Sequence, residues 1–91
     1  MRSFRNKGLA ELFVSGRSAK VSATLQARTL RRLDALDAAD TLDAVNVPGF
    51  DFHALKGYRP TRYSLHVNGP WCVTFEWDAG DALRVDLEQY H

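Results

Sequence analysis

The sequence is poor in cysteine and has no long hydrophobic run. Its single cysteine excludes an internal disulfide, which fits a reducing cytoplasm. No apolar stretch approaches the roughly 18 residues that a membrane-spanning helix needs, and there is no signal-peptide core. The cysteine and the three histidines lack the paired spacing of a zinc site, and no glycine-rich phosphate loop or nucleophile elbow occurs. We therefore expect a cytoplasmic protein that uses no metal or other cofactor and binds no membrane.

Repeats, linkers and low-complexity segments are also absent from the 91 residues. A chain of this length is expected to form a single domain, here residues 1–91, with one modest core. Its composition, 45% hydrophobic and 11% aromatic, argues against disorder.

Acidic residues are missing from a long central stretch, residues 53–75. Lys56, Arg59 and Arg62 fall within this stretch, whereas residues 34–51 carry five aspartates and no base. A net charge of +1 therefore hides a strongly basic segment. Such a segment suits a phosphate backbone, and the alternative is an ordinary solvated surface.

The first half of the chain predicts two helices in succession. Asn6 is a candidate N-cap, and the apolar residues that follow have helical spacing up to a stop at Gly16. Ser22 is the next candidate N-cap, for a helix over residues 23–38 with Arg32 flanking its apolar side. Two helices joined by a short link form a helical hairpin.

In the second half of the chain, the apolar residues recur with a period of two, which is typical of strands. Asp40 is expected to cap one more turn through Val45, before strands at residues 52–56, 62–68, 71–77 and 82–88. Asn68-Gly69 predicts a tight turn between the middle strands, and residues 78–81 link the last pair. The chain is thus predicted to be an α+β domain, with an N-terminal helical hairpin on one face of a mainly antiparallel four- to five-stranded sheet.

Alternation assigns an apolar and a polar face to this sheet. Leu83 falls on the core side and Cys72 on the polar side, with Lys56 and Arg62 at the polar edge. The basic and aromatic residues near the polar face are His53, Lys56, Arg59, Arg62, Tyr63, His66, Tyr90 and His91. Each also has a purely structural interpretation, as solvated surface, packed aromatic or frayed terminus.

Several short motifs have an order and spacing that together are specific. They are Arg2–Phe4 with Lys7–Leu9, Leu33–Ala39, Asn46–Phe50, His53–Gly57 with Arg59, Tyr63–Leu65 with Val67, Asn68 and Trp71, and Val85–Glu88 with Tyr90 and His91. In this order they resemble the HigB toxins, the plasmid maintenance killer family, a branch of the RelE/ParE superfamily of type II toxin–antitoxin systems. The resemblance covers the chain from end to end and implies a compact α+β fold.

The resemblance also implies an activity and partners. It implies a ribosome-dependent mRNA endonuclease that is neutralised by a HigA-type helix-turn-helix antitoxin. The toxin would contact operator DNA only through this antitoxin. The implied chemistry is metal-free: a base takes the proton of an RNA 2′-hydroxyl, which attacks the adjacent phosphate, and an acid protonates the departing 5′-oxygen. Few catalytic groups are needed because mRNA in the ribosomal A site is already positioned.

By matching positions, the implied active-site residues are His53, Lys56, Tyr90 and His91. Lys56 would stabilise the phosphate or act as a base, either histidine would exchange protons, and Tyr90 would stack on a base or orient the phosphate. The expected RNA- or phosphate-binding residues are Arg59, Arg62, His66 and Arg84.

Two residues depart from the family pattern at expected catalytic positions. Cys72 stands where the family usually has an arginine after the hairpin tryptophan, and Gln89 where it has an aspartate before the terminal Tyr-His. A thiol cannot replace a guanidinium on phosphate, and losing such a group costs roughly 10²–10³-fold in rate. Arg62 and Arg84 are the candidates to supply the missing charge from neighbouring strands.

Three alternatives to a weakened mRNA-cleaving toxin remain open at this point. The first is a catalytically silent relative, or a mutant inactivated at Cys72, that keeps antitoxin binding, as the two departures suggest. The second is a ParE-like gyrase poison, against which the matched Lys56 and Tyr90-His91 argue. The third is an unrelated small RNA-binding domain.

Overall fold

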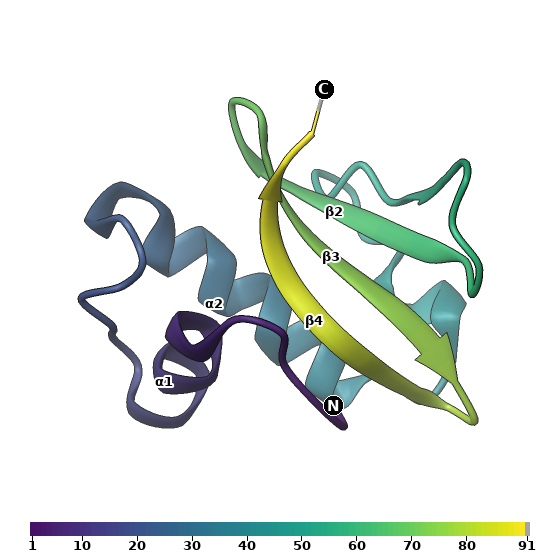
Figure 1. Cartoon of the computed structure of the whole chain (residues 1–91), viewed down its shortest axis with the longest axis horizontal. Helices are drawn as coiled ribbons and strands as arrows, with labels where there is room; N and C mark the ends of the chain where they lie inside the picture. The colour runs from purple at the N-terminus through teal and green to yellow at the C-terminus, as the bar shows by residue number, and fades with distance from the viewer. Residues whose placement is uncertain (91) are drawn as a thin grey trace.

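The computed structural model describes residues 1–90, with two helices packed on one face of a four-stranded sheet (Figure 1). The elements are α1 (Lys7–Ser15), α2 (Ala23–Ala38), a short 3₁₀ helix η1 (Leu42–Val45), β1 (His53–Leu55), β2 (Arg62–Asn68), β3 (Trp71–Asp78) and β4 (Asp81–Gln89). The strands lie in the order β1-β2-β3-β4, and every neighbouring pair is antiparallel. The predicted α+β fold is thereby confirmed. No helix among residues 1–90 combines the length and apolarity needed to cross a membrane.

Capping residues explain the limits of α1, but the predicted caps of α2 and η1 do not act as expected. Asn6 accepts hydrogen bonds from the backbone N–H groups of Gly8 and Leu9, and Gly16 ends α1 with a φ of 83°, as predicted. Ser22 precedes α2, but its hydroxyl pairs with the Thr24 hydroxyl and does not cap the backbone. The N-cap of η1 is Thr41, so the prediction of Asp40 was wrong by one residue.

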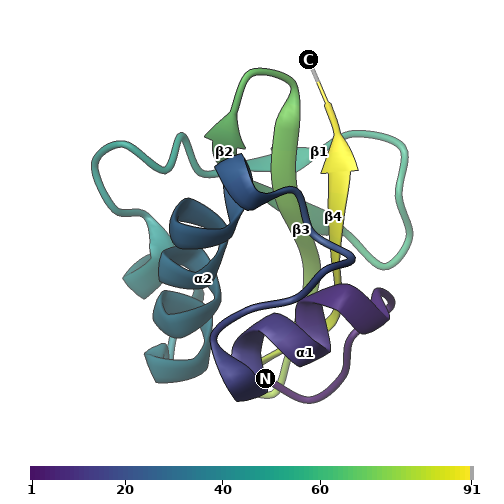
Figure 2. The same cartoon turned by 90° about the vertical axis from the view of Figure 1, so that its left-hand side faces the viewer.

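The core lies between the helices and the sheet. α2 contacts β2, β3 and β4, and α1 contacts α2 and β4, so both helices cover the same face (Figure 2). Its largest fully buried apolar side chains are Leu9, Leu12, Leu33, Leu36, Val45, Leu65, Val67, Val73, Phe75 and Val85. The opposite face of the sheet carries polar side chains, among them Arg62, Ser64, Thr74 and Glu76.

The turn between β2 and β3 differs from the prediction by one residue. Asn68 pairs with Trp71, so the two-residue loop is Gly69-Pro70 and not Asn68-Gly69. Gly69 has a φ of 56° at the first central position, where hairpins of the II′ type place glycine. The link between β3 and β4 closes at Ala79-Gly80, within the predicted residues 78–81.

A β-bulge in β4 reverses the predicted alternation at its start. Thr74 pairs with Asp86 but Glu76 pairs with Leu83, so β4 has one extra residue there, and Arg84 adopts a φ of 48°. Leu83 consequently shares the polar face with Glu76, and Ala82 takes the buried position. The assignment of Leu83 to the core was therefore wrong.

Candidate active site

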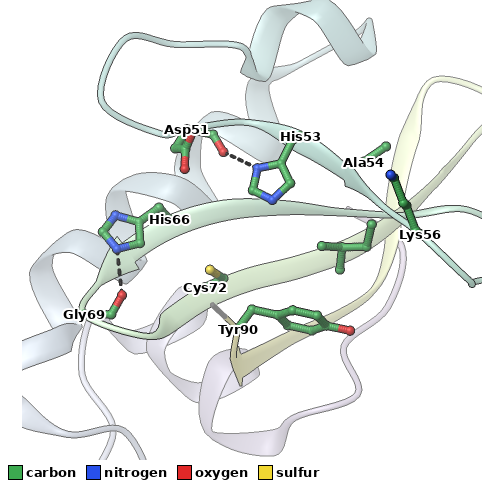
Figure 3. A pocket seen from close by; sticks show the side chains of 9 residues that line it. Asp51, His53, Ala54, Lys56, His66, Gly69, Cys72 and Tyr90 are labelled. Carbon is green, nitrogen blue, oxygen red and sulfur yellow. Dashed lines mark hydrogen bonds between the residues drawn. The ribbon is translucent and has the colours of Figure 1, made fainter.

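A groove of about 510 Å³ lies on the polar side of the sheet, between β1, the β2–β3 turn and the end of β4 (Figure 3). Its lining residues are Asp51, His53, Ala54, Leu55, Lys56, His66, Gly69, Cys72 and Tyr90. It brings together His53, Lys56 and Tyr90, three of the four residues matched to the family's active site. The fourth, His91, lies outside the described residues.

Strand pairing explains why residues distant in sequence meet here. His53 is on β1 opposite Ser64 of β2, and Lys56 follows directly after β1. The backbone N–H of Tyr90 donates to the carbonyl of Pro70 at 2.5 Å. This bond ties the segment after β4 to the β2–β3 turn and places the Tyr90 side chain along the groove (Figure 3).

The two histidines are each oriented by a backbone carbonyl. Nδ1 of His53 is 2.9 Å from the carbonyl oxygen of Asp51, and its Nε2 is 3.3 Å from Oγ of Ser64. Because a carbonyl only accepts, Nδ1 must carry the proton, which leaves Nε2 of the neutral ring as the basic nitrogen. By the same argument, His66 donates from Nε2 to the Gly69 carbonyl at 2.8 Å. His53 thus has the tautomer that a proton acceptor in the groove requires.

Cys72 lies at the floor of the groove, between His53 and Tyr90 (Figure 3). The residue is 4% exposed. Burial, together with the nearby charge of Asp51, raises the pKa of the Cys72 thiol. It is therefore uncharged at neutral pH, so the residue at which the resemblance leads us to expect an arginine contributes no positive charge.

Arg62 and Arg84 do not supply the missing charge, contrary to expectation. Arg62 is 3% exposed, with Nη1 at 3.1 Å from Glu76 Oε2 and Nη2 at 3.1 Å from Thr74 Oγ1. Arg84 Nη1 lies 2.8 Å from the other oxygen of Glu76. Alternation correctly put Arg62 on the polar face, but this part of the face is buried, and a buried guanidinium must be paired. Neither arginine lines the groove.

The remaining sequence candidates lie around the groove. His66 lines it, whereas Arg59 is exposed in the β1–β2 loop and does not line it. Gln89 pairs with Trp71, and Glu88 is the residue opposite Cys72, so Gln89 does not share the face of the groove. Tyr63 is half-buried and stacks on Phe52. Among residues 1–90, no three His, Cys, Asp or Glu side chains are grouped so as to hold a metal ion.

Sequence reasoning missed two residues of this region. Asp51 lines the groove, although the sequence analysis did not count it among the residues near the polar face. Tyr58, in the β1–β2 loop, places its hydroxyl in hydrogen-bond contact with the Tyr90 hydroxyl. Periodicity carries no signal for either, because both are in loops; the closeness of Asp51 and Tyr58 to the matched motif residues His53 and Lys56 was the only available signal.

Arg32 fastens the groove to the helical layer. It was expected to flank the apolar side of α2, but it is 7% exposed, with its guanidinium 4.4 Å from the centre of the Phe50 ring. Its Nε donates to the carbonyl of His66 at 2.9 Å. It therefore holds both the segment before β1 and the strand that carries His66.

Replacing Arg32 by leucine is expected to lower the free energy of unfolding by about 1–3 kcal/mol, because the His66 carbonyl loses its charged donor. Urea denaturation measures the change. Arg31→Leu is the matched control, since Arg31 is exposed on the same helix and should change stability little. Equal losses in the two variants would show that Arg32 does not fasten the groove.

Comparison with known proteins identifies the family. The family described as the RelE-like toxin of the type II toxin-antitoxin system HigB matches residues 2–91. The chain is also 36% identical to the Endoribonuclease HigB of Proteus vulgaris over 91 residues, which is 100% of this chain and 99% of the relative. These matches confirm the resemblance drawn from the short motifs. The chain belongs to the HigB-like family of RelE-like toxins of type II toxin–antitoxin systems.

Proposed function

We propose that this toxin is an endoribonuclease that cleaves translated mRNA in the ribosomal A site, without a metal, in the groove described above. The observation that carries the proposal is the convergence of His53, Lys56 and Tyr90 on one groove of the polar sheet face. RNA as the substrate is supported by the name of the relative in Proteus vulgaris. Ribosome dependence rests on the family resemblance and on the small number of catalytic groups in the groove.

Each group has a role in the proposed reaction. Nε2 of His53 takes the proton from the 2′-hydroxyl, and the resulting oxyanion attacks the adjacent phosphorus. The Lys56 ammonium group stabilises the charge that gathers on the phosphate oxygens. Tyr90 orients the phosphate, and His91, which lies outside the described residues, gives a proton to the departing 5′-oxygen. The bond that forms is 2′-O–P and the bond that breaks is P–O5′.

The charge balance of the groove predicts a slow enzyme. Cys72 is uncharged and Asp51 opposes phosphate, so Lys56 is the one lysine or arginine among the groove-lining residues within 1–90. The ribosome compensates by holding the mRNA in a reactive geometry, which reduces what the toxin itself must contribute.

A second candidate function is supported by the same charge balance. This candidate is a catalytically silent protein, inactive because residue 72 is not an arginine, that still binds its antitoxin. Membership of a type II toxin–antitoxin family implies an antitoxin partner. We propose a HigA-type helix-turn-helix protein for this partner, and contact with operator DNA only through it.

Expression of this chain in bacterial cells, with and without the antitoxin, tests the proposed function. We expect growth arrest that the antitoxin relieves. We also expect primer extension to detect new mRNA 5′ ends within codons of translated reading frames. Lys56→Met is expected to reduce cleavage on the order of 10²-fold, because the phosphate loses its cation. Lys7→Met, which removes an exposed lysine at the start of α1, is the control.

Three outcomes would contradict the proposal. Arrest by Lys56→Met at the level of the parent chain would place the activity elsewhere. Arrest with intact mRNA and broken DNA would indicate a gyrase poison. No arrest, with tight antitoxin binding, would favour the silent relative.

A further inference from the structure

One carboxylate lies in a groove that is otherwise suited to phosphate. Of the groove-lining residues within 1–90, Asp51 is the only acidic one, and its side chain is exposed. It lies at the end of the groove near His66 and Gly69, whereas Lys56 and the Tyr90 hydroxyl lie toward the other end (Figure 3). The groove therefore has a cationic end and an anionic end, with Cys72 between them.

The main chain of Asp51 also takes part in the groove. Asp51 adopts a φ of 48°, a left-handed conformation that aspartate tolerates better than most residues. Its carbonyl oxygen accepts the hydrogen bond from Nδ1 of His53 at 2.9 Å. The same residue thus orients the proposed base through its main chain and presents its carboxylate to the groove. The charge acts within the groove, because it contributes to the raised pKa of the Cys72 thiol.

The chemistry of a carboxylate excludes one ligand and selects another. It repels phosphate, so it does not bind the RNA backbone. It only accepts hydrogen bonds, so it recognises N–H groups on the edge of a base. Guanine presents two adjacent N–H donors on its Watson–Crick edge, and these match the two oxygens of a carboxylate. Adenine and cytosine present one amino group, and uracil presents one N–H between two carbonyls that a carboxylate repels.

We propose that Asp51 is a specificity-determining residue, which binds the Watson–Crick edge of an unstacked guanine whose phosphate lies at the Lys56 end of the groove. Single-stranded RNA is commonly read in this way, through the edges of splayed-out bases. The inference rests on the proposed function in that the groove must accept RNA, but it does not require that the groove cleave it.

Binding of the four nucleoside 5′-monophosphates to the full chain, followed by NMR chemical shifts, tests the inference independently of cleavage. We expect GMP to bind roughly 5- to 150-fold more tightly than UMP, the range for one bidentate base contact. Asp51→Asn replaces one acceptor by a donor, and Asp51→Gly removes the carboxylate at a φ that glycine adopts freely. Both should lose most of the preference for GMP while retaining UMP binding. Asp43→Asn, an exposed aspartate in η1, should retain the preference.

The results separate this inference from the proposed function. A preference for GMP that depends on Asp51, in a protein that cleaves no RNA, would support the inference and contradict the proposed function. The inference would be overturned if the protein bound no nucleotide, bound all four without preference, or kept its preference when Asp51 is replaced. If such a protein cleaves RNA, the proposed function still stands.

Discussion

Replacing Cys72 by arginine is expected to raise the rate of RNA cleavage by roughly 10²–10³-fold, the effect of one well-placed charge-stabilising donor. Cys72 lies between His53 and Tyr90 on the groove floor, so a guanidinium at this position would reach the phosphate that we propose Lys56 contacts. Arginine binds phosphate with two parallel hydrogen bonds, whereas the neutral thiol offers no charge. The nearby carboxylate of Asp51 would partly balance the new charge.

Single-turnover cleavage measures this prediction, with Cys72→Gln as the control. Glutamine adds length and hydrogen-bonding capacity without charge, so it distinguishes the effect of the positive charge on the rate from the effect of a larger side chain. Thermal unfolding of both variants shows whether the buried position accepts the larger side chains. A folded Cys72→Arg protein that is no faster than the parent would mean that the groove does not hold the reacting phosphate.

Replacing Glu76 by glutamine is expected to lower the free energy of unfolding by about 3–5 kcal/mol, because it breaks a buried ion pair on one side only. Glu76 Oε2 lies 3.1 Å from Nη1 of Arg62, and both side chains are almost inaccessible to solvent. The Arg62 guanidinium would remain charged and buried, facing a neutral amide in place of the carboxylate, with Thr74 Oγ1 and the Arg84 carbonyl as further acceptors. Its Nε already has no hydrogen-bond partner within the described residues.

Arg84→Gln is the matched control for this prediction. Arg84 pairs with the same carboxylate, but its side chain is 55% exposed, so removing the pair should cost less than about 1 kcal/mol. Urea denaturation of the two variants gives the comparison. Similar small losses in both would mean that the Arg62–Glu76 pair does not hold this part of the sheet.

Local signals in the sequence predicted the fold well where they were strong. The cap at Asn6 and the glycine at Gly16 delimit α1, and the spacing of leucines placed α2. Errors arose where the structure depends on pairing between strands. The bulge at Arg84 shifts every side chain before it to the other face, which no pattern within one strand reveals.

The alternation of side chains along a strand predicts on which face of the sheet a residue lies, but not how deeply it is buried. Arg62 falls on the polar face as expected, but the sheet buries it against Glu76, and so it leaves the set of groove cations. His53, Lys56 and Tyr90 were found from the family resemblance. Asp51 lies in a segment whose position is set by the packing of Phe50 under Arg32, which is a tertiary contact between distant residues.

The central claim is tested most directly by adding the purified protein to mRNA alone and to the same mRNA on ribosomes with an empty A site, with cleavage read by primer extension. The account predicts slow cleavage at the A-site codon on ribosomes, none on free mRNA, and faster cleavage at the same position by Cys72→Arg. Cleavage of free mRNA at an equal rate would contradict ribosome dependence. No cleavage by either protein on ribosomes would contradict the assignment of this groove as an RNA-cleaving site.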